Sequence, residues 1–186
     1  MEFKKLTVSK HIRLLQPRQT ILCTSRVGDK LNIITLAWSM IISRTPPIVA
    51  ISVAPERFSH DFIKESGEYT INLPTREIIS EVYYCGSHSG RKVDKFKATN
   101  LTPLEGINVK CPRIKECVSH IECKVIDAKT YGDHTLFVGE VVTCLGREDV
   151  LTKGEIDIEK VEIPYHLGGN RFTFNKNEIY EAKIRT

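Results

Sequence analysis

The stretch "ISVAPERFSH" (51–60) brings a cation and a hydroxyl to the point where a strand pattern gives way to a helical one. Arg57 and Ser59 stand at the expected start of that helix, just after Pro55. A helix start offers unpaired N–H groups and the positive end of the helix dipole, which suit a bound anion. Against this, serine often caps its own helix, and Asp61 already occupies the favourable first turn. The stretch alone leaves both interpretations open.

The loop "GSHSGRKVDKF" (86–96) is a second stretch rich in glycine, hydroxyls and cations. Ser89 supplies a hydroxyl, while Lys92 and Lys95 supply charge. The loop lacks the G-x4-G-K-[ST] pattern of a Walker loop, and no G-x-G-x-x-G occurs in the chain. A solvated basic loop is the plain alternative to a phosphate site.

Two neighbouring stretches, 32–43 and 45–53, alternate large and small side chains. This alternation indicates strands in which one face carries only small side chains. The small positions are Thr35, Ala37, Ser39, Ser43, Ala50 and Ser52. Either another element packs closely on these faces, or a flat ligand lies over them. Combined with the two stretches suited to anions, the second interpretation describes flavin mononucleotide (FMN), a flat ring that carries a phosphate.

His134 follows the turn Gly132-Asp133 and is a candidate proton donor or ring contact at the rim of a barrel. A histidine that merely faces solvent at the edge of a hairpin is the alternative. No nucleophile–base pair can be assembled from the spacing of residues, so the sequence offers nothing positive for hydrolase chemistry.

The elements that must position these residues are mostly strands. The apolar patterns predict strands at 20–27, 69–73, 118–128 and 135–145, and helices at about 59–66 and from Thr75 to Gly86. Strands that outnumber short helices favour an antiparallel barrel over a βαβ array.

The turns between these elements carry glycine signals. Gly28-Asp29 and "YGDH" (131–134) indicate hairpins, and the paired glycines of 163–174 suggest a tight turn or close backbone contact. The alternation in 118–128 predicts two faces. The residues expected to face the core are Ile121, Cys123 and Val125, and those expected to face outward are His120, Glu122 and Lys124.

The composition is that of an ordinary globular protein, and we expect a single domain over 1–186. The chain has 41% hydrophobic and 27% charged residues, with no run of the roughly 18 apolar residues that a membrane span needs. Its amino terminus has no apolar signal region, so we expect a cytoplasmic location. The net charge of +4 is scattered, which argues against nucleic acid or membrane as a partner.

The six cysteines do not match a common zinc or iron–sulfur pattern, so no metal site is expected. We expect reduced thiols. Cys23, Cys123 and Cys144 lie within strand patterns and should be buried, whereas the places of the other three, which flank loops, stay open.

The sequence resembles the flavin reductase-like family, and within it the flavoredoxin branch of FMN-binding split barrels. The resemblance rests on the order and spacing of several segments across most of the chain from about residue 17. These are 32–63, "YTINLP" (69–74), "SGRKVDKF" (89–96), 112–125, "GDHTLFVGEVV" (132–142) and "YHLGGNRF" (165–172). It implies a mainly β fold, a six-stranded antiparallel Greek-key split barrel with a few short peripheral helices. It also implies a homodimer with FMN near the subunit interface.

The resemblance also implies roles for individual residues. Along the ring or ribityl chain it places Thr35, Ala37, Trp38 and Ser39, with the backbone of Ser52, Val53 and Ala54 flanking it and Asn72 nearby. Around the phosphate it places Arg57, Ser59, Ser89, Lys92, Lys95 and Phe96. His134 corresponds to a histidine on the nicotinamide or substrate side, and is the one catalytic candidate.

The function that follows is that of an FMN-dependent oxidoreductase, which moves electrons from NADH, NADPH or a redox partner protein. An NAD(P)H:flavin oxidoreductase that releases reduced flavin is the alternative. A barrel that binds single-stranded nucleic acid is disfavoured, because no aromatic stripe accompanies the basic residues.

Overall fold

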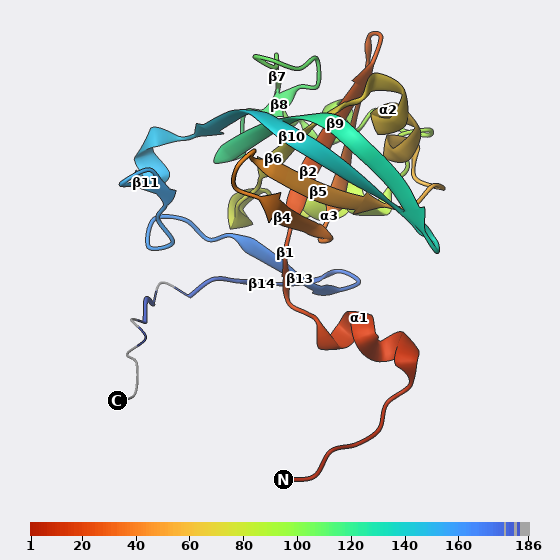
Figure 1. Ribbon diagram of the computed structural model, residues 1–186. Coiled ribbons are helices and arrows are strands. Elements are labelled where there is room, and N and C mark those ends of the chain that lie inside the picture. The colour runs from red at the N-terminus through yellow and green to blue at the C-terminus, as the bar shows by residue number, and fades with distance from the viewer. Residues whose placement is uncertain (177, 181, 183–186) are drawn as a thin grey trace.

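The computed structural model describes residues 1–176, 178–180 and 182, and one antiparallel sheet dominates it (Figure 1). Its seven strands are β2 (Ile21–Val27), β3 (Lys30–Leu36), β4 (Ser39–Ser43), β5 (Ile48–Val53), β6 (Glu68–Leu73), β9 (Ser119–Tyr131) and β10 (His134–Gly146). Their order in the sheet is β3-β2-β6-β9-β10-β5-β4. The mainly β antiparallel architecture is confirmed, with seven strands in place of the six expected.

The seventh strand arises because 32–43, expected as one strand, divides at Ala37-Trp38. The part before the break pairs with β2 and the part after it pairs with β5, at the opposite edge of the sheet. The chain thus closes the barrel by turning a corner at these two residues, where the amide of Ser52 donates to the carbonyl of Trp38 over 2.9 Å. Beyond the corner the large side chains leave the core, and Met40 is 59% exposed.

Two predicted hairpins are confirmed. Gly28 joins β2 to β3 with φ of 56°, and Gly132 joins β9 to β10 with φ of 60°, a region that L-residues rarely adopt. The long β9–β10 hairpin crosses the top of the molecule in Figure 1.

The prediction of which residues of 118–128 face the core is only half right. Cys123 is fully buried and Ile121 packs against the same core, as expected. However, Glu122 is also fully buried and His120 is 8% exposed, although both were expected to face outward. The segment 105–114 covers that face, and the amides of Ile107 and Asn108 each donate to the Glu122 carboxylate over 2.7 Å.

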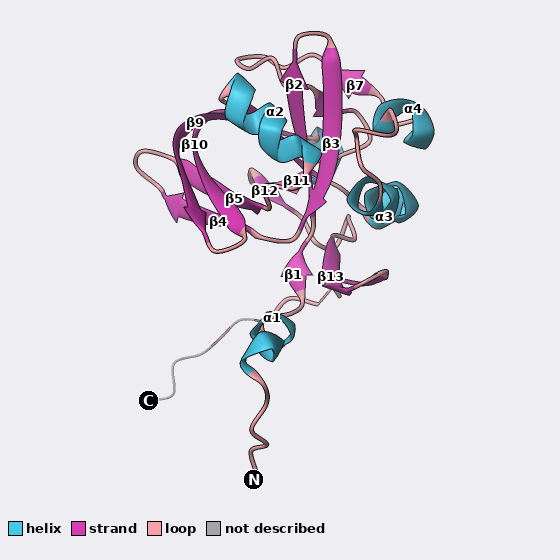
Figure 2. Ribbon diagram, turned by 90° about the vertical axis from the view of Figure 1, so that its right-hand side faces the viewer, coloured by secondary structure: helices cyan, strands magenta, loops and turns pink. Residues whose placement is uncertain are grey.

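The helices are short and peripheral. They are α1 (His11–Leu14), α2 (Phe58–Ser66), α3 (Ile79–Ser87) and α4 (Lys95–Thr99), with 3-10 turns η1 (Val8–Lys10), η2 (Arg76–Ile78) and η3 (Glu148–Val150). α3 and α4 contact each other and the same strand, β3 (Figure 2). Gly67 ends α2 in a left-handed conformation, as predicted.

The predicted helix from Thr75 to Gly86 differs in detail. Thr75 precedes the turn η2 without capping it, and Gly86 lies inside α3 instead of ending it. A Cβ atom on Gly86 would come within 3.1 Å of the Thr35 Cβ atom, so this glycine serves the close packing of α3 on β3.

A small three-stranded sheet lies below the barrel in Figure 1, next to α1. It consists of β1 (Arg18–Gln19), β13 (Pro164–Gly168) and β14 (Arg171–Phe174). The last two form a hairpin through Gly168 and Gly169, both with positive φ, which confirms the predicted tight turn. Short pairs elsewhere are β7 (Pro103–Leu104) with β8 (Arg113–Ile114), and β11 (Leu151–Thr152) with β12 (Glu155–Ile156).

The cysteines are free, and all except Cys144 are buried. The prediction for Cys144 was therefore wrong, while Cys85, Cys111 and Cys117 lie in the interior. Burial raises the pKa of the Cys85 thiol to about 11, which keeps it protonated and unreactive. The described residues hold no cluster of three or more metal-ligating side chains. No described helix has the length and apolarity needed to cross a membrane.

Candidate functional site

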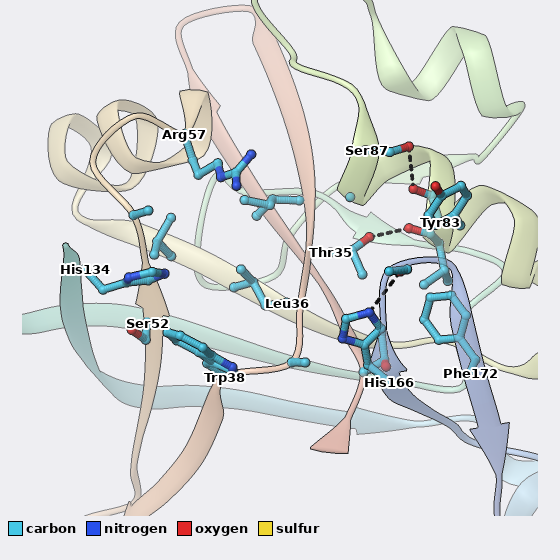
Figure 3. Close-up of a pocket in the computed structure, with 18 residues that line it drawn as sticks. Thr35, Leu36, Trp38, Ser52, Arg57, Tyr83, Ser87, His134, His166 and Phe172 are labelled. Atoms are coloured by element: carbon cyan, nitrogen blue, oxygen red, sulfur yellow. Dashed lines mark hydrogen bonds between the residues drawn. The ribbon is translucent and has the colours of Figure 1, made fainter. Parts of the chain in front are cut away.

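A pocket of about 420 Å³ opens where the corner of the barrel, α3 and the β13–β14 hairpin meet (Figure 3). Eight of the predicted site residues line it. They are Thr35, Ala37 and Trp38 at the corner, Ser52, Val53, Ala54 and Arg57 at and beyond the end of β5, and His134 at the start of β10. We call this the main pocket. Three of the small positions, Thr35, Ala37 and Ser52, line it together with larger apolar side chains such as Leu36 and Trp38.

A second pocket of about 140 Å³ adjoins the main pocket and differs from it in character. It is lined by polar and charged residues that include Asn32, Ser59, Ser89 and Lys95. The two pockets share the lining residues Ile34, Arg57, Gly86 and Ser87, so they meet. We call the second one the small pocket.

Lys95 is a buried cation in the wall of the small pocket, and only 5% of it is exposed. Its Nζ donates to the carbonyl of Ile33 over 2.7 Å and to the carbonyl of Cys85 over 2.6 Å. Burial lowers the pKa of Lys95 to about 8, and the charge of Arg57 adds to this against the opposing effect of Cys85. An ammonium has three N–H groups, so one remains for a ligand.

The start of α2 is open at the same place. Ser59 does not cap the helix, because its Oγ accepts from Nδ2 of Asn32 over 2.6 Å. Asp61, whose charge argued against an anion, forms a 2.6 Å ion pair with the Arg91 guanidinium. The positive end of the α2 dipole is therefore available to a bound anion, because the charge of the nearby Asp61 carboxylate is already neutralised by Arg91.

Arg57 lines both pockets from the N-cap position of α2. Its side chain is 58% exposed, and its Nε lies 3.6 Å from the Glu56 carboxylate. An ion pair this exposed is weak, so the guanidinium is free to turn towards a stronger anion.

His134 lies at the rim of the main pocket and is held from two sides. Its ring centroid is 4.6 Å from that of Trp38, and its Nδ1 lies 2.7 Å from Oδ1 of Asp133. That hydrogen bond, and then the charge of His134, lower the pKa of the Asp133 carboxyl. A carboxylate accepts, so Nδ1 carries the proton and Nε2 is left for a ligand.

Four predicted site residues lie outside both pockets. Ser39 lines a separate groove of about 270 Å³, and Lys92 lines an outer, open groove. Phe96, which belongs to α4, packs with apolar residues of α3 and β3 and also lines the outer groove. Asn72 is fully buried under the segment 105–114, on the same face of the sheet as His120, and its Oδ1 accepts from the amide of Ile114 over 2.9 Å. None of these four lines the main pocket or the small pocket.

The main pocket also has lining residues that the sequence did not single out. They include Thr20, the α3 residues Val82, Tyr83 and Gly86, and the hairpin residues His166, Gly169 and Phe172. The paired glycines Gly168 and Gly169 indicated close backbone contact, but the sequence did not show which segment they would contact. Thr20 is fully buried, and its Oγ1 has no hydrogen-bond partner among the described residues.

Comparison with known proteins agrees with this architecture. Residues 14–162 match the family model described as flavin reductase like domain. An uncharacterized protein of Pyrococcus abyssi is 35% identical over 171 residues, which cover 92% of this chain and 98% of that protein.

Two solved flavoredoxins are also similar to the chain. The structure from Methanosarcina acetivorans has a TM-score of 0.87 at 27% identity, covering 98% of this chain and 96% of that one. The structure from Desulfovibrio vulgaris (Miyazaki F) has a TM-score of 0.86 at 29% identity, covering 97% of both chains. On the match of the family model and the identity to its relatives, the chain belongs to the flavin reductase like family.

Proposed function

We propose that the protein is an FMN-binding redox flavoprotein of the flavoredoxin type. The observation that carries this proposal is the junction of the two pockets. A mostly apolar pocket of about 420 Å³ opens into a polar one of about 140 Å³ whose wall contains the buried Lys95. FMN has the same division into a flat, mostly apolar ring system and a short chain that ends in a phosphate.

The main pocket has the features that a flat ring requires. Ala37 and Ala54 line it on the barrel side and Gly86 on the α3 side, so the side chains at these positions are short or absent. Ring systems bind close to backbone only where side chains are short. The unpartnered Thr20 hydroxyl adds a buried polar atom, which a polar ring edge would satisfy.

The small pocket has the features that a phosphate requires. Lys95 and Arg57 supply positive charge, Ser59 and Ser89 supply hydroxyls, and the start of α2 supplies its dipole. Cations combined with a helix start form a common phosphate site in proteins.

Bound FMN would supply reversible acceptance and donation of electrons, and the side chains would bind it and control access to it. On this assignment Lys95 and Arg57 hold the phosphate, and Trp38 narrows the entrance to the ring. The Asp133 carboxylate fixes the orientation of His134, which borders the space where a nicotinamide or another substrate would approach.

The decisive experiment is an absorbance spectrum of the purified protein, followed by anaerobic addition of NADH and then NADPH. We expect a yellow protein with flavin bands. Bleaching by either nucleotide identifies a nicotinamide donor, whereas bleaching only by a reduced partner protein identifies an electron carrier. A colourless protein that also fails to bind added FMN would contradict the proposal.

The alternative, an oxidoreductase that releases reduced flavin, differs in how long flavin stays bound. Gel filtration of the loaded protein in its oxidised and reduced states separates the two functions. A carrier retains flavin in both states, whereas a releasing reductase loses it on reduction.

The strand β4 supports a homodimer. It is an edge strand whose outer residues are apolar, with Ile41 75% exposed and Met40 59% exposed. Exposed apolar edges are rare in monomers because they promote association. The strand directly follows Trp38, so a second copy bound here would lie next to the main pocket.

Replacing Ile41 by glutamate should therefore convert a dimer into a monomer, because a charge would enter the apolar interface. Light scattering after gel filtration measures the mass directly. Ile126→Glu is the matched control, since Ile126 is 53% exposed on β9, away from this edge. A monomeric wild-type protein, or equal effects of the two changes, would rule out β4 as the interface.

A further inference from the structure

The β13–β14 hairpin forms one wall of the main pocket, yet it lies outside the segment matched by the family model, which ends at residue 162. The body of the protein fixes its position. The amide of Thr20 donates to the carbonyl of Pro164 over 2.9 Å, and Arg13 donates to the carbonyl of Leu167 over 3.3 Å. Phe172 packs against the core beneath α3. These contacts make the hairpin a fixed part of the pocket wall.

His166 presents a defined hydrogen-bonding group on this wall. Its Nε2 lies 3.1 Å from the carbonyl oxygen of Gly169, and a carbonyl only accepts, so Nε2 carries the proton. In the neutral ring Nδ1 is then an acceptor, and it has no partner among the described residues. Figure 3 shows this second nitrogen on the side of the ring that faces Leu36 and Trp38.

The same wall holds a second polar group without a partner. Thr20 pairs with Pro164 and Arg18 pairs with His166 in adjacent strands, so Thr20 and His166 point to the same face. Both line the main pocket. His166 lies at the end opposite Arg57 and Ser87, where the phosphate is assigned (Figure 3). The far end of the pocket is thus suited to a polar edge of a ligand that includes an N–H donor.

We propose that Nδ1 of His166 accepts a hydrogen bond from N3–H of the flavin ring and so fixes which edge of the ring points to the hairpin. In the oxidised ring N3–H is the only N–H donor, and it lies on the pyrimidine edge between two carbonyl oxygens. An acceptor on the wall selects that edge, because the dimethylbenzene edge would leave Nδ1 unsatisfied. The inference rests on the proposed FMN site and assigns a positioning residue within it.

The test compares the affinities of FMN and 3-methyl-FMN, which lacks the N3 proton, by quenching of flavin fluorescence. Wild-type protein should bind 3-methyl-FMN about tenfold more weakly, as expected for one lost hydrogen bond with its partner left unpaired. In His166→Leu, FMN binding should weaken by about the same factor, and the two flavins should become nearly equal. In His166→Gln, whose amide oxygen accepts, the preference for FMN should return.

Asn170→Ala is the matched control, because Asn170 is exposed at the tip of the same hairpin and lines neither pocket. It should keep the wild-type ratio of affinities. Equal binding of the two flavins by the wild type, or an unchanged preference in His166→Leu, would overturn the role of His166. The wild-type and Gln comparison decides the question even if the leucine variant fails to fold. Binding of neither flavin by the wild type would instead contradict the proposed function itself.

Discussion

Replacing Lys95 by methionine should weaken FMN binding by about 30- to 150-fold, which corresponds to about 2–3 kcal/mol for a lost charged hydrogen bond. Two of the three N–H groups of Lys95 donate to the carbonyls of Ile33 and Cys85. The ammonium is thereby held in one position in the wall of the small pocket, with its third N–H available for a phosphate oxygen. A cation fixed in a buried site interacts more strongly than one in water.

Riboflavin separates this electrostatic role from a structural one, because it has the ring and ribityl chain but no phosphate. Riboflavin affinity should be nearly the same in Lys95→Met and in the wild type. Lys92→Met is the control for charge, since Lys92 lies on the same segment but lines the outer groove. It should lower FMN affinity by less than about threefold, as for an exposed charge. Equal losses for FMN and riboflavin in Lys95→Met would mean that the substitution only distorts the pocket.

The pH dependence of FMN binding follows from the same residue. The pKa of Lys95 is lowered to about 8 by burial, so in the flavin-free protein the ammonium is charged below that pH and neutral above it. A bound phosphate favours the charged form. The affinity for FMN relative to riboflavin should therefore fall as pH rises through about 8.

The stability of the flavin-free protein should change in the opposite direction. An unfolded chain, with an ordinary lysine pKa of 10.5, binds more protons than the folded chain between about pH 8 and 10.5. This residue's contribution to the free energy of unfolding therefore rises with pH across that window. Unfolding of the flavin-free protein at several pH values checks the sign.

The features that could be predicted from the sequence depend on neighbouring residues. Alternation located the strands 20–27 and 69–73, and glycine located the turns at Gly28 and Gly132. The start of α2 near Arg57 could be predicted because the apolar period changes there from two to about 3.6 residues. All three signals act over a few residues, where backbone conformation is decided locally.

The direction in which a polar side chain points depends on elements far away in the sequence. Lys92 and Lys95 lie three residues apart in one basic loop, and only Lys95 turns inward, because α4 begins there and β3 and α3 offer carbonyls. Asn72 was expected near the ring but lies under the segment 105–114, where groups on β2 and β9 bond it. The alternation of residues within a strand does not show which distant segment will cover each face of that strand.

Glu122 is the clearest case of a residue covered by a distant segment. Because it is buried, we expect its replacement to cause a large loss of stability. Alternation placed it outward with Lys124, and Lys124 is indeed exposed. Glu122 is fully buried because the segment 105–114 folds over it and directs two amides at its carboxylate. Nε of Arg113 lies 3.9 Å from the same carboxylate and supplies a counter-charge. The Glu122 carboxylate thus holds the segment 105–114 against the barrel.

Replacing Glu122 by leucine should lower the free energy of unfolding by about 4 kcal/mol, in the range for breaking a buried ion pair. Leucine fills the space but leaves the amides of Ile107 and Asn108 without their acceptor, and it removes the negative charge that faces the Arg113 guanidinium. Glu122→Gln should lose about half as much, because its amide keeps one acceptor oxygen. Urea unfolding at constant m-value measures both. Glu140→Gln is the control, because Glu140 is an exposed residue of β10, and it should change stability by less than about 0.5 kcal/mol. A leucine variant as stable as the control would mean that segment 105–114 is held by its apolar contacts alone.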